Sequence, residues 1–311
     1  MKTSLSALLS GLATCVVLTA CGGGSPDSPV ASNVQTTSVP ALGAVYGASV
    51  YVYNTAGQLL GTGTTDAVTG KASLSVPSAA SGPFIYQVVL SSGSRFYDEG
   101  LDAVVTVNPN ESLTMLSVAT KASGEVGITA LSNMALRLAG IEPEMLGTRA
   151  AQDLSLDKLT DAVATVIAVL GLPADFDLFA APVAASPSNK NPASVYGKLL
   201  AQMAINAGPG NNAFTQAASL AQAINSQGVV ANAQTLVDLN LALQASAAAM
   251  GMTVTDAQHL IHNPGLLAQQ VALIRPTVRA SLTPPVVVAA PVVPLVGGSA
   301  SFTGGGTSTF N

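Results

Sequence analysis

The first candidate for chemistry is a serine with a lysine three residues further along. Ser155 and Lys158 fit the Ser-x-x-Lys arrangement, in which the lysine can activate the serine as a nucleophile. The partner motifs Ser-Asp-Asn and Lys-Thr-Gly do not occur in the sequence, and neither does a Gly-x-Ser-x-Gly elbow. Because an apolar helical pattern begins directly after Ser155, we expect this residue to be a helix N-cap.

A second candidate is a pair of histidines with a nearby aspartate. Asp256, His259 and His262 are spaced three residues apart, so a helix would place all three along one side. A metal site would need a fourth ligand from elsewhere, and Leu260 stands where the zinc-protease pattern has glutamate. We expect a polar helix end here and no metal.

The third candidate is an acidic turn between two expected strands. Asp98, Glu99 and Asp102 supply carboxylates that could bind calcium, but they do not spell out a complete ligand loop. We therefore expect a solvated β-turn. Taken together, the three candidates predict no catalytic residue, no metal and no cofactor.

Composition narrows the function classes further. Only 9% of the 311 residues are charged and the net charge is −5, so the chain has no basic surface for nucleic acid. The two cysteines, Cys15 and Cys21, both lie near the N-terminus, which excludes disulfides, zinc–thiolate sites and cysteine nucleophiles from the rest of the chain. These observations favour a protein that is not an enzyme.

The N-terminal residues have the features of an export signal that ends at a cysteine. Lys2 supplies positive charge, and the apolar run at residues 5–18 is too short to span a bilayer comfortably. Leu18-Thr19-Ala20-Cys21 resembles the lipobox of bacterial lipoproteins, whose cysteine is acylated on sulfur and becomes the new N-terminus. The resemblance implies a lipoprotein signal peptide at residues 1–20 and a lipid on Cys21. The alternative is an ordinary cleaved signal with an incidental cysteine.

The residues after Cys21 bear on where the protein is sorted. In lipoproteins of this kind an aspartate after the cysteine retains the protein in the inner membrane, so Gly22 implies the outer membrane of a Gram-negative cell. Residues 21–40 are rich in Gly, Ser, Pro and Thr, and we expect them to form a flexible linker.

Short β-patterns separated by turn residues occupy residues 41–120. Residues 48–53 and 72–76 alternate between apolar and polar side chains, and Gly57, Gly70 and Gly93 lie in the turns. Residues 47–76 resemble the carboxypeptidase-regulatory-like, transthyretin-like and Ig-like sandwiches that are common in bacterial surface proteins. The resemblance implies a small antiparallel β-sandwich that is non-catalytic and serves as a spacer or binding module.

Helical spacing follows the β-patterns. Leu159, Val163 and Val166 fall on one face of a helix that begins near Ser155, and further helices are expected at residues 192–207, 212–227, 231–250 and 255–274. Residues 128–135 resemble the passage that begins the helical region after such sandwiches in bacterial surface proteins. The predicted fold class is therefore α+β, with the β-sandwich followed by an all-α helical bundle at 125–275, a long loop at 174–191 and a Pro/Val-rich then Gly/Ser/Thr-rich tail at 276–311.

These features predict a lipoprotein anchored to the bacterial outer membrane through Cys21. It would act as a structural, adhesive or ligand-binding module at the cell surface, with a protein, peptide or glycan as its partner. One alternative is an accessory lipoprotein that faces the periplasm and serves envelope assembly or secretion. Another alternative is a hydrolase whose active-site residues are far apart in the sequence.

Overall fold

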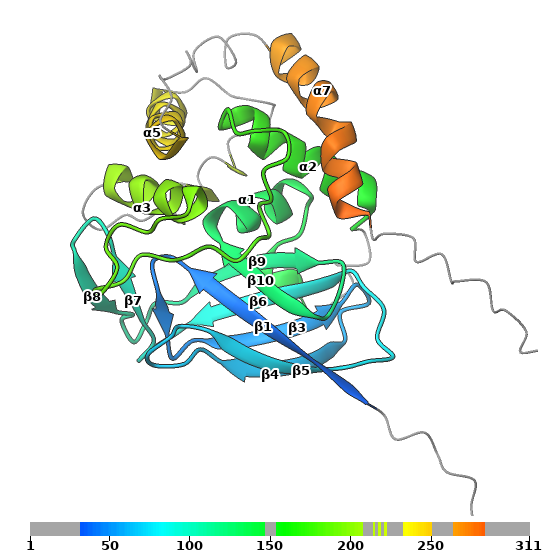
Figure 1. Ribbon diagram of the computed structural model, residues 1–311, viewed down its shortest axis with the longest axis vertical. Helices are drawn as coiled ribbons and strands as arrows, with labels where there is room; N and C mark the ends of the chain where they lie inside the picture. The colour runs from blue at the N-terminus through cyan, green and yellow to red at the C-terminus, as the bar shows by residue number, and fades with distance from the viewer. Residues whose placement is uncertain are drawn as a thin grey trace, which may run out of the picture.

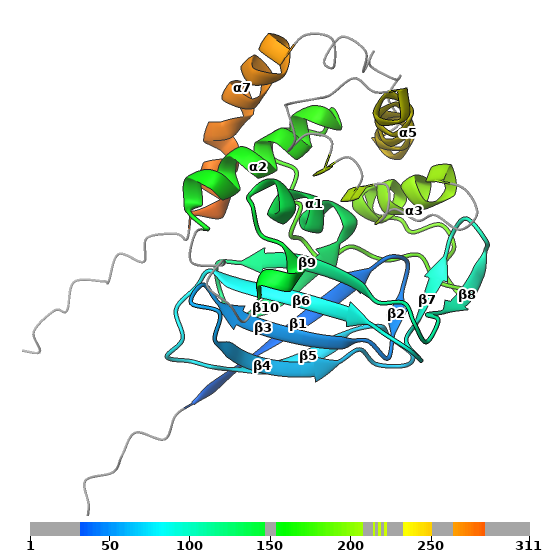
Figure 2. The same cartoon turned by 180° about the vertical axis from the view of Figure 1, so that it is seen from behind.

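The computed structural model describes residues 32–146, 154–207, 233–250 and 264–283, together with positions 214, 217, 218, 221 and 222. In this part of the chain ten strands and five α-helices form a mixed α+β fold. Figure 1 shows the strands gathered at one side of the molecule and the helices layered over them. The view from behind in Figure 2 shows the same division.

The largest sheet is antiparallel and has the strand order β4-β3-β6-β9. Its strands are β3 (Ser49–Asn54), β4 (Leu59–Thr64), β6 (Phe84–Leu90) and β9 (Leu113–Ala119). The alternation predicted from sequence is present in β3, where Val50 and Val52 are buried while the residues on either side of them are more exposed. Strand β6 lies in the middle of the sheet and is buried along almost its whole length.

A second sheet has the order β10-β1-β5, with β1 in its centre. Its strands are β1 (Asn33–Ala41), β5 (Ala72–Pro77) and β10 (Gly124–Thr129). β1 pairs antiparallel with β5 and parallel with β10. The sheet therefore joins three segments that are far apart in the sequence.

The two sheets face one another across a shared interior. The Tyr86 hydroxyl of β6 lies 3.0 Å from Thr36 Oγ1 of β1, and Thr36 Oγ1 donates to the Gly124 carbonyl at 3.2 Å. Along one side β4 packs against β5, where a Cβ on Gly61 would lie 2.6 Å from the Ser75 carbonyl oxygen. Glycine at this position allows the two edge strands to approach closely.

A small third sheet extends from one end of the others. It has the order β2-β7-β8 and consists of β2 (Val45–Tyr46), β7 (Arg95–Asp98) and β8 (Ala103–Thr106). β7 is buried apart from Arg95, whereas β8 is largely exposed. The turn between β7 and β8 is the acidic turn identified in the sequence.

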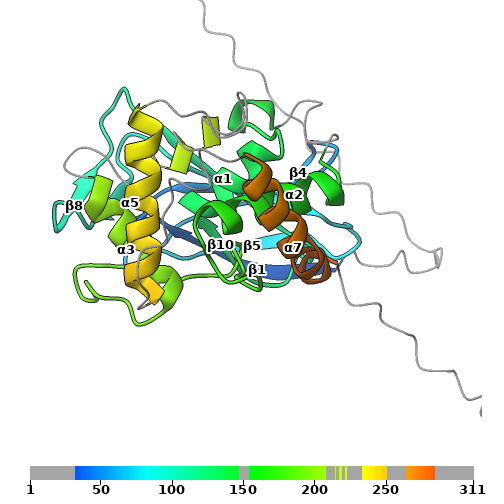
Figure 3. The same ribbon diagram turned by 90° about the horizontal axis from the view of Figure 1, so that it is seen from above.

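The helices form two packed groups over the strands, as the view from above in Figure 3 shows. α1 (Ala130–Leu138) follows β10 without a loop and packs on β9, and a short 3₁₀ turn (Pro143–Met145) comes after it. α2 (Leu156–Val169) packs between α1 and α7 (Pro264–Leu282), while α3 (Val195–Ala207) packs against α5 (Ala233–Met250). None of the described helices combines the length and apolar character needed to cross a membrane.

One hydrophobic cluster runs through both the sheets and the helices. It includes Val50 and Leu116 of the sheets, Met134 of α1, Ile167 of α2 and Val278 of α7. The buried faces of α1 and α2 thus complete the same core that the strands begin. Burial of this shared apolar surface is the main stabilising contribution to the contact between helices and sheets.

The element boundaries differ from the predicted ones in three places. Residues 33–40 were assigned to the linker, but they belong to β1 and are held on both sides by hydrogen-bonded strands. Residues 125–129 were expected at the start of the helical region, but they belong to β10 (Gly124–Thr129), and the first helix begins at Ala130. The tail was expected from Pro276, yet α7 continues to Leu282 because Val278 and Leu282 are buried against the core.

Candidate functional site

A cleft of about 340 Å³ lies where the strands meet the helices. It is bounded by the end of β9, the β9–β10 turn, α2, the segment 176–179 and the C-terminal end of α7. Its apolar lining consists of Val118, Ala119, Val126, Val163, Phe176, Leu178, Phe179 and Leu282. The volume is within the range of roughly 300–1,000 Å³ that is usual for ligand-binding pockets.

The strand side of the cleft is fixed by the helix that follows β10. Thr129 accepts a hydrogen bond from the Ser132 N–H at 3.0 Å, and Ser132 Oγ accepts from the Thr129 N–H at 2.9 Å, which makes a reciprocal cap on α1. Ser132 Oγ also lies 2.8 Å from the Leu116 carbonyl oxygen, and Asn133 Oδ1 accepts from the Leu116 N–H at 3.0 Å. Helix α1 is therefore joined directly to the edge of β9, next to the cleft.

The segment 176–179 forms another wall of the cleft, and Tyr196 of α3 is one of the residues that hold it. The Tyr196 hydroxyl of α3 donates to the Leu178 carbonyl at 2.7 Å and lies 2.6 Å from Thr129 Oγ1. The Tyr196 ring also packs edge to face on Phe176, with 5.1 Å between ring centroids. Burial raises the pKa of Tyr196, so the hydroxyl keeps its proton and remains a donor.

A glycine of β10 allows this wall to approach the strand. The Gly127 N–H donates to the Phe179 carbonyl at 2.8 Å, and a Cβ on Gly127 would lie only 2.1 Å from the Ala180 carbonyl oxygen. A larger residue would separate the segment from the strand. The absence of a side chain at Gly127 therefore allows Phe179 and Ala180 to lie close against β10.

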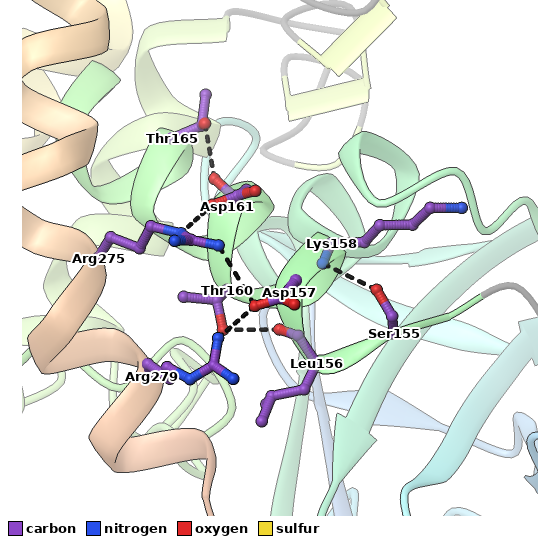
Figure 4. A network of polar contacts seen from close by, with 9 residues as sticks. All are labelled: Ser155, Leu156, Asp157, Lys158, Thr160, Asp161, Thr165, Arg275 and Arg279. Atoms are coloured by element: carbon purple, nitrogen blue, oxygen red, sulfur yellow. Dashed lines mark hydrogen bonds and ion pairs between the residues drawn. The ribbon is translucent and has the colours of Figure 1, made fainter.

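The helical wall is formed by the contact between α2 and α7, which Figure 4 shows from close by. Arg275 Nε donates to Asp161 Oδ1 at 2.5 Å, Arg275 also pairs with Asp157 at 3.3 Å, and Arg279 pairs with Asp157. All four side chains are substantially exposed, so these ion pairs orient α7 on α2 while contributing little stability. The apolar contact made by Ile274 and its buried neighbours holds the helix in place.

The titratable side chains of the cleft stand at its rim. Lys121, Glu125 and Asp177 line the cleft and are exposed, and Glu125 also forms an ion pair of 2.6 Å with Lys71. An apolar floor with a mixed polar rim can bind an extended, uncharged segment through both side-chain burial and backbone hydrogen bonds.

The acidic turn between β7 and β8 is more ordered than the solvated turn expected from sequence. Asp98 is buried and its Oδ1 accepts from the Leu101 N–H at 2.9 Å. Asp102 adopts a positive φ of 51° and is held by Lys190 Nζ at 2.6 Å and by the Tyr97 hydroxyl at 2.5 Å. The Lys190 hydrogen bond is the main cause of the lowered pKa of Asp102.

Glu99 in this turn has the most perturbed carboxylate. Burial raises its pKa to about 7, and the neighbouring Asp98 adds to the rise, although N–H groups of Glu99 itself and of Gly43 bond the carboxylate and oppose it. Gly43 has a φ of 55°, and a Cβ there would lie 2.1 Å from the Tyr97 carbonyl oxygen. Among the described residues, no three His, Cys, Asp or Glu side chains are grouped closely enough to hold a metal ion.

Some of the residues singled out in the sequence lie within the described structure and others lie outside it. Ser155 is the N-cap of α2, as predicted, and its Oγ accepts from the Lys158 N–H at 3.1 Å. Asp256, His259 and His262 lie outside the described residues, and so does Cys21. The structure therefore shows nothing about a metal at the histidines or a lipid on the cysteine.

Most cleft residues were missed by the sequence analysis. Val163 was assigned to the buried face of α2, and it is buried there. Phe176, Phe179 and Tyr196 were not singled out, although aromatic residues are only 4% of the chain and could have drawn attention to these positions. Phe176 and Phe179 were hidden because they lie within the loop expected at 174–191, which has no periodic pattern.

Comparison with models of known protein families found no match. Searches of curated proteins and of solved structures found no significantly similar protein. The assignment of a function therefore depends on the residues and geometry of this chain.

Proposed function

We propose that this protein is a lipoprotein tethered to the bacterial outer membrane through Cys21, and that it serves as a non-enzymatic binding or adhesive module at the cell surface. In this proposal the facing sheets correspond to the β-sandwich suggested by residues 47–76, and the helices are the α-helical domain built on it. The partner would be a protein, a peptide or a glycan. The observation that carries the proposal is the position of the start of β1 relative to the helices.

β1 begins on the side of the molecule that lies away from the helical layer. Figures 1 and 2 both show its first residues at the strand side, with α5 and α7 at the opposite side. The residues between Cys21 and Asn33 can span at most about 40 Å when fully extended. A membrane attached at Cys21 would thus face the strand side and leave the helical side available to a partner.

The helical side carries exposed apolar side chains of the kind that binding surfaces use. Val195 and Ile205 of α3 are 43% and 50% exposed, and Leu273 of α7 is 73% exposed. Exposed apolar side chains can contribute to the binding of another macromolecule, and in this proposal those of α3 and α7 lie on the side that would face away from the membrane.

The test has two arms, one for the anchor and one for the orientation. Cells expressing the full chain would be labelled with an alkyne analogue of palmitate, and the Cys21→Ser variant would serve as the matched control. Incorporation into the wild type alone supports the lipid anchor, and equal signals from both chains refute it.

Protease treatment of intact cells decides the orientation. Digestion of the wild-type domains in intact cells, with a periplasmic protein left intact, supports display at the surface. Digestion only after the outer membrane is permeabilised refutes surface display and favours the alternative, an accessory lipoprotein of the periplasm.

A further inference from the structure

The cleft lies at the point where α7 ends. Ser281, Leu282 and Thr283 all line it, and Leu282 is buried in the core. The Thr283 N–H and Oγ1 both bond the Arg279 carbonyl, which closes the last turn of the helix. The part of the chain that the structure describes therefore ends at the cleft.

The next residues of the sequence have the chemistry of an extended apolar strand. Pro284 and Pro285 lack the N–H that a continuing helix would bond, and a residue that precedes proline favours extended conformations. Val286, Val287 and Val288 follow, and β-branched residues such as these favour strands. Residues 284–311 contain no charged side chain, so the segment can be buried without loss of ion hydration.

The cleft presents strand edges as well as apolar walls. β9 is the outer strand of its sheet, and the N–H and C=O of Leu116 point away from β6 toward α1. Because backbone groups alternate in direction along a strand, the next N–H and C=O that point outward belong to Val118, which lines the cleft. On β10 the outward N–H of Gly127 bonds Phe179, and the same alternation places the outward groups of Glu125 at the cleft.

We propose that the chain's own segment Pro284-Pro285-Val286-Val287-Val288 occupies this cleft in the same molecule. The segment adds as an extended strand along the edge of β9 or β10 and buries valine side chains against Val163, Phe179 and Leu282. Edge pairing of this type uses main-chain hydrogen bonds for affinity and alternate side chains for fit. An external ligand of the cleft would have to displace this segment. The proposal does not depend on the lipid anchor or on the side of the membrane.

Cysteine cross-linking gives a direct test, since Cys21 is the last cysteine of the sequence. In a full-chain Cys21→Ser background without the signal peptide, Ser123→Cys on the exposed cleft rim would be combined with Val287→Cys. The matched control pairs Val287→Cys with Ser92→Cys. Ser92 is exposed at the other end of β6 and β9, about 20 Å away.

Under mild oxidation we expect an intramolecular disulfide in the Ser123→Cys chain, formed on the order of tenfold faster than in the Ser92→Cys chain. Equal rates in the two chains would overturn the proposal, as would a disulfide found only in cross-linked dimers, because the segment would then dock on a second copy.

Hydrogen exchange provides a second readout in a chain without introduced cysteines. Val286→Asp combined with Val288→Asp should release the segment, since charged side chains cannot remain against the apolar floor. Backbone amides of residues 121–126 should then exchange at least about tenfold faster than in the wild type, while amides of β3 remain protected. Unchanged exchange at residues 121–126 would contradict the proposal.

Discussion

Replacing Glu99 by glutamine should make the protein more stable at neutral and alkaline pH. The folded protein holds the Glu99 proton up to a pKa of about 7, whereas the unfolded chain releases it at the ordinary value of 4.5. Between these pH values the unfolded state binds fewer protons, so the free energy of unfolding of the wild type falls as pH rises. Above pH 7 both states are ionised and the full cost of the buried charge remains.

The size of the effect follows from the same pKa difference. Each pH unit between the two pKa values corresponds to about 1.4 kcal/mol, so the partly buried charge of Glu99 destabilises the wild type by at most about 3.5 kcal/mol at pH 8. Glutamine has the same shape, and its carbonyl oxygen can still accept the Gly43 N–H. The Glu99→Gln variant should therefore match the wild type near pH 4.5 and exceed its stability increasingly toward pH 8.

Urea denaturation followed by far-ultraviolet circular dichroism at pH 5 and pH 8 measures this difference. The matched control is Glu144→Gln, because Glu144 is an exposed carboxylate. The two variants differ only in where the charge is removed. If Glu99→Gln changes the stability difference between pH 5 and pH 8 no more than Glu144→Gln does, the argument that partial burial raises the pKa of Glu99 is refuted.

Three further predictions concern the walls of the cleft. Val163→Asp should unfold the helices, because Val163 is only 3% exposed and a buried charge costs several kcal/mol. Circular dichroism should then show loss of the helical signal and of cooperative unfolding. A soluble variant with full helicity would contradict the buried position of Val163. Ile274→Ala should lower the free energy of unfolding by about 2–4 kcal/mol, whereas Arg275→Ala should lower it by less than about 1 kcal/mol. Equal losses for the two variants in urea titrations would show that the ion pairs hold α7. Tyr196→Phe should lower the free energy of unfolding by about 1–3 kcal/mol, because it leaves buried hydrogen-bond partners unpaired. Amide exchange at residues 176–180 should also become faster. Unchanged exchange at these residues would argue against Tyr196 as a support of that wall.

Local sequence patterns predicted the elements that depend on local interactions. The N-cap at Ser155 needs only a hydroxyl in front of a helical pattern, and the bounds of α3 and α5 lie within a few residues of the predicted ranges. The buried face of α2 followed from the spacing of Leu159, Val163 and Val166 in the same way. In each case the helix and its buried face can be predicted from residues that are three or four positions apart in the sequence.

The elements that were missed depend on distant partners. β1 has the composition of a linker, but β5 and β10 pair with its backbone on either side and Thr36 is buried against Tyr86 of the facing sheet. Its two partner strands lie about 40 and about 90 residues further along the chain, beyond the range of any local pattern. The cleft was missed for the same reason, because four separate segments build it.

Pro276 shows a different limit of sequence analysis. Proline removes one helical hydrogen bond and was therefore expected to mark the end of the helix. In α7 it lies on the exposed side, where water can satisfy the freed carbonyl of Ala272. Burial of Val278 and Leu282 beyond it then offsets the cost of continuing the helix.

The central position of β1 has a mechanical consequence. A force applied to the chain ahead of Asn33 acts along the strand, which β5 holds from Asn33 to Ser38 and β10 holds from Thr36 to Ala41. Both ladders are then loaded in shear, so many hydrogen bonds must break together instead of opening one at a time as in a peeled hairpin. A pull on the chain ahead of Asn33 would thus be resisted by the central strand of the second sheet, and extraction of that strand would expose the interior between the two larger sheets.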